Sequence, residues 1–543
     1  MNNFIKKIIE KDLKEKKIKK LHTRFPPEPN GYLHIGHAKS ICLNFGLAKK
    51  YEGKCNLRFD DTNPNSKNKK YIKYIKKDIK WLGFKWHGAT CYSSKYFKIL
   101  YKYALKLIKK KLAYVDEMSH EEIKYHRGTL NKKGINSPYR NRCISENLSL
   151  FEKMKKGYFS EGKACLRAKI DMSSPIILMR DPILYRIKFT KHHKTKNKWC
   201  IYPMYDFAHC ISDYIEKITH SLCTSEFSEN RYLYEWILKN IEVKNKPKQY
   251  EFSRLKLEYT VLSKRKIQTL INNNIIKKWN DPRIFTISSL RNKGYTPYSI
   301  RKFCNVIGIT RKDHMIQMSS LENCIKKELN LKSPRIMAVV DPIKIVITNL
   351  PKNHVENINF PNHPNRIDMG FRKSIFSNVI YIEKNDFSEN NVNKKYRGLI
   401  LNGEIRLRYS YIIKCNKVLK NKKNKIIKLL CTYDKTTLNK NPKNRSVKGV
   451  IHWLSSINCF IAQFNFYERL FNIKNPDSKK YFLNFINNES IIIKKGYVER
   501  GIKNIKEKKR YQFERIGYFY LKKIKNNHVW KFNRIVELKN TKK

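Results

Sequence analysis

The chain has 543 residues, with 116 Lys and Arg against 45 Asp and Glu, so its formal net charge is +71. This length allows several domains with large buried cores, and the charge favours a polyanionic partner over an acidic one. A blander cause competes, because Lys, Asn, Ile and Tyr are abundant while Gly and Pro number only 19 and 18, as an AT-rich genome would produce. The charge alone is therefore weak evidence for nucleic-acid binding.

The sequence lacks the patterns of a disulfide-rich, metal-binding, secreted or membrane protein. The thirteen cysteines contain no Cys-x-x-Cys, and the closest pair is Cys200 and Cys210, so we expect neither a disulfide framework nor a protein-bound metal. No apolar run approaches ~18 residues, and the Lys-rich N-terminus lacks the apolar segment of a signal peptide. We expect a cytoplasmic protein with no membrane association.

The first elements alternate between strand and helix. A short strand at 21–25 leads through a Pro-rich turn into a helix, and a second strand at 55–60 ends in Asp60 and is followed by a helix that stops at Gly83. This order predicts a parallel sheet, whose ligands bind at the carboxyl ends of the strands. Asp60 lies at such an end, although an Asp before Thr-x-Pro is also a common helix cap or turn residue.

The remaining chain divides by its periodicity. From 94 to 198 the rhythm breaks, with a capping box at Ser119 and Glu122, and we expect the sheet to resume between 199 and 225. Residues 256–335 are helical in pattern, including a helix between Thr296 and Gly308 and a second capping box at Ser319 and Glu322. From 336 onward apolar residues alternate, which indicates β-barrels.

These patterns predict four domains. An α/β domain of Rossmann type would comprise 1–93 and 199–255, interrupted by an inserted domain at 94–198. A helical subdomain would span 256–335, and two β-barrels would fill 336–543.

The turn after the first strand carries His34-Ile35-Gly36-His37. The two histidines share one face of the first helical turn, while Gly36 leaves room for a flat ring against the backbone. A helix N-terminus attracts phosphate, so a nucleotide fits this turn. A bare His-x-Gly-His is more often a pair of capping or exposed histidines, but the strand before it and the helix after it favour the binding interpretation.

A second motif, Val261-Leu262-Ser263-Lys264-Arg265-Lys266, lies where the α/β pattern gives way to helices. The two stretches together resemble the His-Ile-Gly-His and Lys-Met-Ser-Lys-Ser signatures of the class I aminoacyl-tRNA synthetases. The preceding Pro-Pro-Glu-Pro-Asn-Gly-Tyr-Leu resembles the glutaminyl and glutamyl branch, and the resemblance runs from about Phe4 to Arg534. Leu262 replaces the usual Met, a swap that keeps volume and apolarity.

The resemblance implies an adenylation site. His34, His37 and Lys264 would be the catalytic residues that stabilise the negative charge growing on the phosphates of ATP, and Mg²⁺ would accompany the ATP. The residues that would hold ATP, by resemblance, are Glu28, Pro29, Asn30, His34, Ile35, Gly36, His37, Ala38, Lys39, Ser40, Thr224, Arg254, Leu255, Leu262, Ser263 and Lys264.

The resemblance also implies which residues surround the amino acid: Arg24, Asp60, Tyr205, His209 and Cys223. A glutamate-using relative has an arginine at the position of Cys223, whereas a thiol would leave a substrate carboxylate unpaired. Glutamine is therefore favoured over glutamate. Cys223 can also be interpreted as a small buried apolar residue, and both interpretations are compatible.

For tRNA, the resemblance implies contacts by Leu130, Glu229, Arg335, Lys395, Arg406, Gln512 and Arg515. Leu130 would open the terminal base pair of the acceptor stem, and Glu229 replaces the usual Asp. Lys395 and Gly398 depart from the Gln and Arg common in the anticodon-reading domain, where Arg397 could substitute. Any single barrel arginine is more often a phosphate contact than a base reader.

The implied activity is ATP-dependent ligation of L-glutamine to tRNA(Gln), by a chain that we expect to be a monomer. A glutamate-specific enzyme of the same branch is one alternative. A catalytically silent tRNA-binding paralogue is another, although the intact His34, His37, Asp60 and Lys264 speak against it.

Overall fold

The computed structural model describes residues 3–65, 68–390, 396–442, 444–501, 508–524 and 529–538. The chain forms two compact units. The first comprises Met1–Leu257, Thr286–Ser288 and Arg301–Ile316, and the second Glu258–Phe285, Ser289–Ile300 and Gln317–Lys543. The stretch predicted as one helical subdomain, 256–335, is thus divided between the two units.

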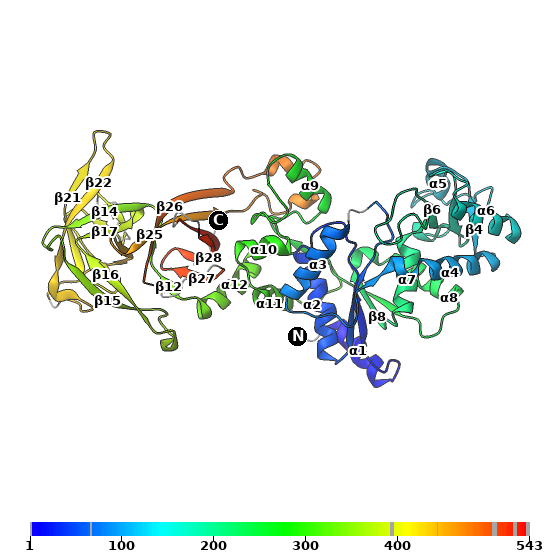
Figure 1. Ribbon diagram of the computed structural model, residues 1–543, viewed down its shortest axis with the longest axis horizontal. Coiled ribbons are helices and arrows are strands. Elements are labelled where there is room, and N and C mark those ends of the chain that lie inside the picture. The colour runs from blue at the N-terminus through cyan, green and yellow to red at the C-terminus, as the bar shows by residue number, and fades with distance from the viewer. Residues whose placement is uncertain are drawn as a thin grey trace. The chain divides into compact units, whose positions relative to one another are not determined.

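A parallel sheet organises the first unit (Figure 1). Strands β1 (His22–Phe25), β2 (Lys54–Phe59) and β3 (Cys91–Tyr92) pair in parallel, and β8 (His220–Thr224) pairs in parallel with β9 (Lys248–Phe252). The Thr219 N–H donates to the His22 carbonyl at 2.9 Å, so β8 begins beside the start of β1. The two strands predicted at 21–25 and 55–60 are confirmed.

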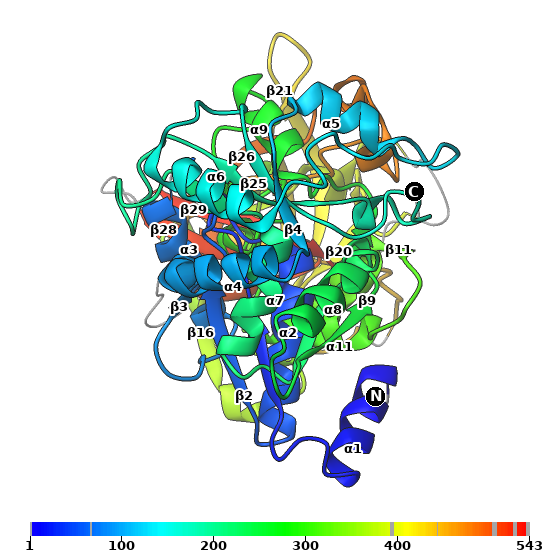
Figure 2. The same cartoon turned by 90° about the vertical axis from the view of Figure 1, so that its right-hand side faces the viewer.

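Helices α1 (Phe4–Lys14), α2 (Ile35–Lys50), α3 (Asn68–Trp81), α7 (Tyr205–Ile215) and α8 (Asn230–Asn240) accompany this sheet, and α2 packs against β1 and β2 (Figures 1 and 2). Ile5 and Ile9 of α1 are fully buried against Leu43 and Leu47 of α2. Gly83, with φ +86°, follows α3 as predicted.

The inserted region forms its own antiparallel sheet of β4 (Ala113–Asp116), β5 (Cys165–Ala168), β6 (Ile183–Ile187) and β7 (Ile201–Pro203), with helices α4 (Phe97–Lys109), α5 (His120–Arg127) and α6 (Ile144–Lys156). The capping box at Ser119 and Glu122 is confirmed. The parallel sheet resumes at β8, within the predicted range of 199–225, whereas β7 at the start of that range pairs with β6 of the inserted sheet.

Along the chain, the α/β region is followed by α9 (Lys264–Asn272), α10 (Ile287–Lys293), α11 (Pro297–Ile307), α12 (Met318–Lys332) and the parallel pair β10 (Leu255–Leu257) and β11 (His314–Ile316). Thr296 caps α11 as predicted, since its hydroxyl accepts the Ser299 N–H at 3.0 Å. The predicted capping box at Ser319 and Glu322 is wrong. The N-cap of α12 is Gln317, because the buried Met318 already belongs to the first turn of the helix.

Two seven-stranded sheets fill the second unit, each around its own apolar core. One runs β12 (Arg335–Ile336), β27 (Arg510–Phe513), β28 (Gly517–Ile524), β29 (Trp530–Glu537), β25 (Cys459–Tyr467), β26 (Ile491–Glu499), β13 (Ala338–Val339). The other runs β23 (Val450–Ile451), β20 (Glu404–Leu407), β21 (Ile412–Lys420), β22 (Ile426–Asp434), β14 (Pro342–Ile347), β17 (Val379–Glu383), β24 (Trp453–Ser455).

The order of strands shows why these sheets are barrels. In each sheet the two outermost strands are separated in the chain by a single residue, Met337 in one and His452 in the other, so the two edges meet. The predicted barrels are confirmed. Two short pairs complete the unit, β15 (Val355–Pro361) with β16 (Phe371–Ser377) and β18 (Phe387–Ser388) with β19 (Leu399–Ile400).

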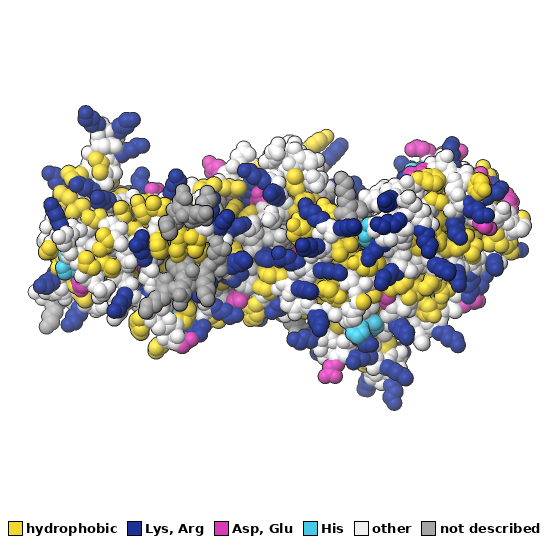
Figure 3. All heavy atoms as spheres, viewed as in Figure 1, with side chains coloured by type: hydrophobic (Ala, Val, Ile, Leu, Met, Phe, Trp, Pro, Cys, Tyr) yellow, Lys and Arg dark blue, Asp and Glu magenta, His cyan; other side chains and the backbone are white. Residues whose placement is uncertain are grey.

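Among the helices of the described residues, none has both the length and the apolarity needed to cross a membrane. Lys and Arg side chains are scattered over the visible face of both units rather than gathered in one patch (Figure 3). This spread fits the compositional explanation for much of the positive charge.

Candidate functional site

The predicted nucleotide turn is a helix start built from two histidines. His34 is the N-cap of α2, and its Nδ1 accepts the Gly36 N–H at 3.1 Å. His37 returns the interaction, since its Nδ1 accepts the His34 N–H at 3.0 Å. The two ring centroids lie 3.8 Å apart. The arrangement is a capping box in which imidazoles replace the usual hydroxyl and carboxylate.

This geometry fixes the tautomer of both neutral rings. Because each Nδ1 accepts a backbone N–H, the ring proton of a neutral imidazole must lie on Nε2. His34 and His37 therefore each present an Nε2–H donor at the N-terminus of α2, where the helix dipole also favours negative charge.

Gly36 cannot be replaced without disturbing the cap. A Cβ added there would come within 2.9 Å of the His34 ring and 4.0 Å of Leu255 Cβ. Leu255, predicted to contact ATP, thus lies near the glycine that leaves the backbone open. Gly36 and Leu255, which were predicted separately to contact ATP, therefore lie next to each other.

The other predicted ATP residues differ in what they present. Ile35, Ala38 and Lys39 are buried, and the Lys39 Nζ donates to the Ser253 carbonyl at 2.7 Å and to its hydroxyl at 2.9 Å. Burial lowers the pKa of Lys39 to about 8. These three side chains face the protein interior, so a contact of theirs with ATP would involve the backbone.

The more exposed members of the set are held by local contacts. The Asn30 side chain donates to Glu28 at 2.5 Å, next to the buried Pro29. At the end of β8, the Thr224 hydroxyl donates to Glu226 at 2.9 Å, and Arg254 pairs with the same carboxylate at 3.3 Å. Ser40, on α2, lies within 3.4 Å of the Asn44 amide nitrogen.

Four of the predicted amino-acid residues belong to one buried network. Arg24 of β1 donates through Nη2 to His209 Nε2 at 2.8 Å, and His209 Nδ1 lies 3.3 Å from Asp60 Oδ2. The ring of Tyr205 stacks on that of His209 with centroids 4.9 Å apart. The structure thus brings together residues that are up to 185 positions apart in the chain.

Cys223 joins this group from β8. The neighbouring Leu222 carbonyl accepts from Arg24 Nη1 at 2.7 Å, which places Arg24 at the same end of the strand. Burial raises the pKa of Cys223 to about 12, so the side chain is a neutral thiol at physiological pH. It offers no charge to a substrate carboxylate.

Two members of the network were missed by the sequence interpretation: Arg58 and Asp213. Arg58 Nη1 donates to Asp213 Oδ1 at 2.7 Å, and its Nε donates to Asp60 at 2.7 Å. Burial opposes ionisation of Asp60, but the charge of Arg58 and the hydrogen bond from His209 outweigh it and lower its pKa to about 2. Spacing could have revealed both residues, because Arg58 interrupts a buried strand and Asp213 lies one helical turn after His209.

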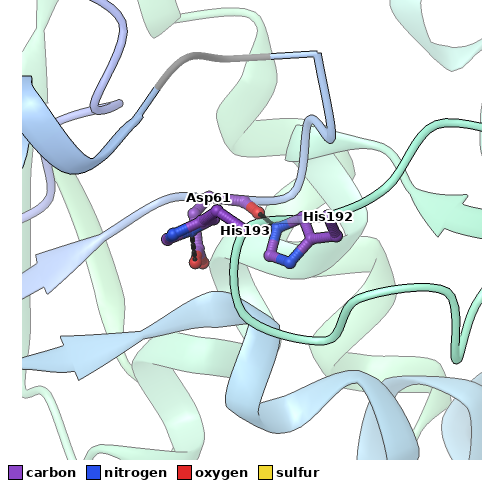
Figure 4. A group of neighbouring side chains, drawn as sticks. All are labelled: Asp61, His192 and His193. Carbon is purple, nitrogen blue, oxygen red and sulfur yellow. Dashed lines mark hydrogen bonds and ion pairs between the residues drawn. The ribbon is translucent and has the colours of Figure 1, made fainter.

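A separate polar group lies beside Asp60. His193 Nε2 lies 2.7 Å from Asp61 Oδ2, and the two side chains point toward each other (Figure 4). His192 Nδ1 accepts the N–H groups of Lys194 and Thr195, each at 3.2 Å, so its Nε2 bears the proton and donates to the Asp61 carbonyl. A protonated nitrogen is not a metal ligand. The group is a clamp between the β6–β7 loop and the end of β2.

In the inserted domain, Leu130 is 78% exposed at the tip of a turn in which Thr129 and Lys132 exchange backbone hydrogen bonds. The buried Arg180 holds this turn, because its Nη1 donates to the carbonyls of Arg127, Thr129 and Lys132 at 2.8–2.9 Å. The turn is rigid enough to present an apolar side chain outward. Glu229, in the other predicted acceptor-stem position, is exposed just before α8.

Three predicted anticodon residues, Arg335, Gln512 and Arg515, line one cavity of about 710 Å³ in the second unit, together with the unpredicted Arg408 and Glu514. Arg335 is already engaged by the carbonyls of Ser333 and Asn330.

Arg515 forms a bidentate pair with Asp386 at 2.6 and 2.7 Å. Arg406 donates to the carbonyls of Ser410 and Thr437 in the other barrel. At Gly398, an added Cβ would meet the Asp386 backbone carbonyl at 2.6 Å, so a larger residue would require the backbone to shift. Lys395 lies outside the described residues.

The second motif belongs to the second unit. Ser263 is the N-cap of α9, Lys264 is its first residue, and Leu262 is buried. The predicted contact of Lys264 with ATP stays a prediction.

Comparison with known proteins now gives the class. A family model described as "tRNA synthetases class I (E and Q), catalytic domain" matches residues 20–331, and two models of the anti-codon binding domain of the same family match 333–434 and 450–522. The chain belongs to this family of class I tRNA synthetases.

The most similar relatives carry one name. "Glutamine--tRNA ligase" of Buchnera aphidicola subsp. Acyrthosiphon pisum is 58% identical over 551 residues, covering 99% of this chain and 96% of that protein. Proteins of the same name from Proteus mirabilis and Cronobacter sakazakii are 57% and 55% identical, each covering 99% of this chain and 97% of the relative.

Proposed function

We propose that this chain is a glutamine–tRNA ligase that activates L-glutamine with ATP and transfers it to tRNA(Gln). The observation that carries the proposal is its identity of 55–58%, over 99% of its length, to relatives of that name. Membership of a family whose models cover both a catalytic and an anticodon-binding region supports the same activity.

In the first step, a carboxylate oxygen of glutamine attacks the α-phosphorus of ATP, and the bond to the departing pyrophosphate breaks. Mg²⁺ enters with ATP as part of the substrate. The Nε2–H groups of His34 and His37 donate to the phosphate oxygens as their charge grows, and Lys264 adds a third, cationic donor. In the second step, a ribose 2′-hydroxyl of the terminal adenosine attacks the adenylate carbonyl and AMP departs.

The amino-acid pocket fits glutamine. Asp60, ionised at physiological pH, suits the α-ammonium, and the Tyr205 hydroxyl suits a side-chain amide. The neutral Cys223 leaves a glutamate carboxylate without a partner. These assignments extend to Leu130 and Glu229 for the acceptor stem and to Arg335, Lys395, Arg406, Gln512 and Arg515 for the anticodon.

The test is charging of an unfractionated tRNA pool by the purified chain, with labelled glutamine in one reaction and labelled glutamate in another. We expect glutamine to be attached to tRNA(Gln) alone. A higher kcat/KM for glutamate would make the chain a glutamate-specific member of the family. Absence of tRNA-dependent AMP formation with either amino acid would make it a silent tRNA-binding protein.

A further inference from the structure

The amino-acid pocket contains two arginines whose side chains are fully buried, Arg24 and Arg58. Both donate to one oxygen of Asp213, Arg24 through Nε at 3.1 Å and Arg58 through Nη1 at 2.7 Å. The other oxygen of Asp213 accepts from the hydroxyls of Ser221 at 2.7 Å and Tyr234 at 3.1 Å. Asp213 is therefore the acceptor on which the two guanidinium groups converge.

The charges of this buried group cancel. Asp60 is the second acid, paired with Arg58 at 2.7 Å, so two carboxylates face two guanidinium groups. Glu216 adds a carboxyl 3.6 Å from Arg58, although burial raises its pKa. The network has no surplus positive charge whether Glu216 is ionised or not.

His209 adds no charge when its hydrogen bonds are followed. His209 Nε2 lies 2.8 Å from Arg24 Nη2, and its Nδ1 lies 3.0 Å from Arg58 Nη2 and 3.3 Å from Asp60 Oδ2. A guanidinium group can only donate, so a ring protonated at both nitrogens would place an N–H against a guanidinium N–H on each side. These contacts disfavour an imidazolium at this position.

The hydrogen bonds of Arg24 are also nearly exhausted. Its guanidinium has five N–H donors. Four of them are used: by Asp213, by the Leu222 carbonyl, by the Ser221 hydroxyl at 2.6 Å and by His209. One donor is enough for the oxygen of an amide but not for the two parallel bonds by which arginine holds a carboxylate.

We propose that Asp213 is a positioning residue that sets amino-acid specificity: by neutralising and orienting Arg24 and Arg58, it leaves the pocket unable to hold a side-chain carboxylate. The inference rests on the proposed glutamine–tRNA ligase activity and goes beyond it. Cys223 is uncharged at the position where a glutamate-using relative has an arginine. Asp213 prevents Arg24 and Arg58, which are already present, from pairing with the side-chain carboxylate of glutamate.

The experiment compares kcat/KM for glutamate with kcat/KM for glutamine in tRNA charging. Asp213→Asn removes the charge and keeps the shape, so the two arginines lose one compensating negative charge. We expect the glutamate-to-glutamine ratio to rise about tenfold or more. Asp213→Glu keeps the charge and should leave the ratio within about threefold of that of the unchanged protein.

Two further variants separate charge from folding. Asp116→Asn breaks another buried pair, with Arg167 at 2.7 Å, in the inserted domain, and should leave the ratio unchanged. Arg58→Gln combined with Asp213→Asn restores neutrality and should cancel the gain of the single variant. If Asp213→Asn does not fold, Arg58→Gln alone gives the reverse test, because its surplus negative charge should raise the Ki of glutamate as an inhibitor.

Failure of the inference is distinct from failure of the proposed function. If the unchanged protein does not charge tRNA with glutamine, the proposed function is wrong. If it does, but folded Asp213→Asn keeps the original ratio, or Asp213→Glu raises it equally, the role of Asp213 is overturned. A fall or no change in the Ki of glutamate with Arg58→Gln also overturns it.

Discussion

The turn proposed to bind ATP and the pocket proposed to bind the amino acid are built in opposite ways. The turn takes its chemistry from four consecutive residues whose side chains bond to their own backbone. The pocket draws on β1, β2, α7 and β8, and its central contact joins Arg24 to Asp213, 189 residues apart. A local device can be read from a short motif, whereas a network held by distant residues depends on the whole sheet being assembled. The difference predicts which substitutions damage chemistry and which damage the fold.

The largest effect should come from the centre of the pocket. Asp213→Ala leaves two buried arginines with one remaining acid, and breaking a buried ion pair costs about 3–5 kcal/mol. Urea unfolding should show this loss in the free energy of unfolding.

The matched control is Glu226→Gln, which removes an acid from a half-exposed pair with Arg254. This exposed pair should contribute less than about 1 kcal/mol. If both variants lost the same free energy of unfolding, the buried pairs of Asp213 would contribute no more to stability than an exposed pair.

His37→Ala tests the turn, and should reduce kcat for aminoacylation by about 10²–10³, as expected for loss of a donor to developing charge. The thermal unfolding midpoint should change little by comparison, because only one cap hydrogen bond is lost. His87→Ala, outside the turn, serves as the control. A large drop in stability with near-normal kcat would show that the two histidines are capping residues and nothing more.

Acid should weaken the pocket through Asp60. The folded-state pKa of Asp60, about 2, is below its ordinary value of 3.8, so the folded protein binds fewer protons than the unfolded chain. The stability contributed by Asp60 is therefore present above about pH 4 and is lost as pH falls toward 2, a change of about 2 kcal/mol.

Denaturation measured between pH 5 and 2 checks this slope. The variant Asp60→Asn should flatten it, and an unchanged slope would show that the charge of Asp60 is not linked to folding.

The smallest effect should come from Ser221→Ala. Its hydroxyl accepts from Arg24 and donates to Asp213, so the variant removes two hydrogen bonds but no charge. We expect a loss of about 1–2 kcal/mol. The glutamate-to-glutamine ratio should not change, and a change as large as that of Asp213→Asn would assign specificity to hydrogen bonding rather than to charge.

The same contrast explains what the sequence could predict. The cap at His34, the helix between Thr296 and Gly308 and the alternating strands of the barrels follow from short-range spacing, and the structure has them. Spacing marks Arg58 and Asp213 as polar residues at buried positions, but it does not show that they pair with each other across distant elements. Similarly, β7 was assigned to the wrong sheet because pairing partners are not encoded in one strand's own pattern.

In one place the alternation of polar and apolar residues did not show where one strand ends and the next begins. Apolar residues occupy every odd position from 405 to 415, yet the structure divides this stretch into β20 and β21 at Tyr409, whose φ is +56°. A tight turn with a side chain in the left-handed region leaves the alternation intact on both sides. The pattern alone cannot show it.

The histidine cap has a consequence for how the turn responds to its surroundings. Since the backbone N–H groups of His34 and Gly36 occupy the two Nδ1 atoms, protonating either ring would break a bond that holds the start of α2. The start of the helix thereby orients both rings and sets the direction in which each Nε2–H points.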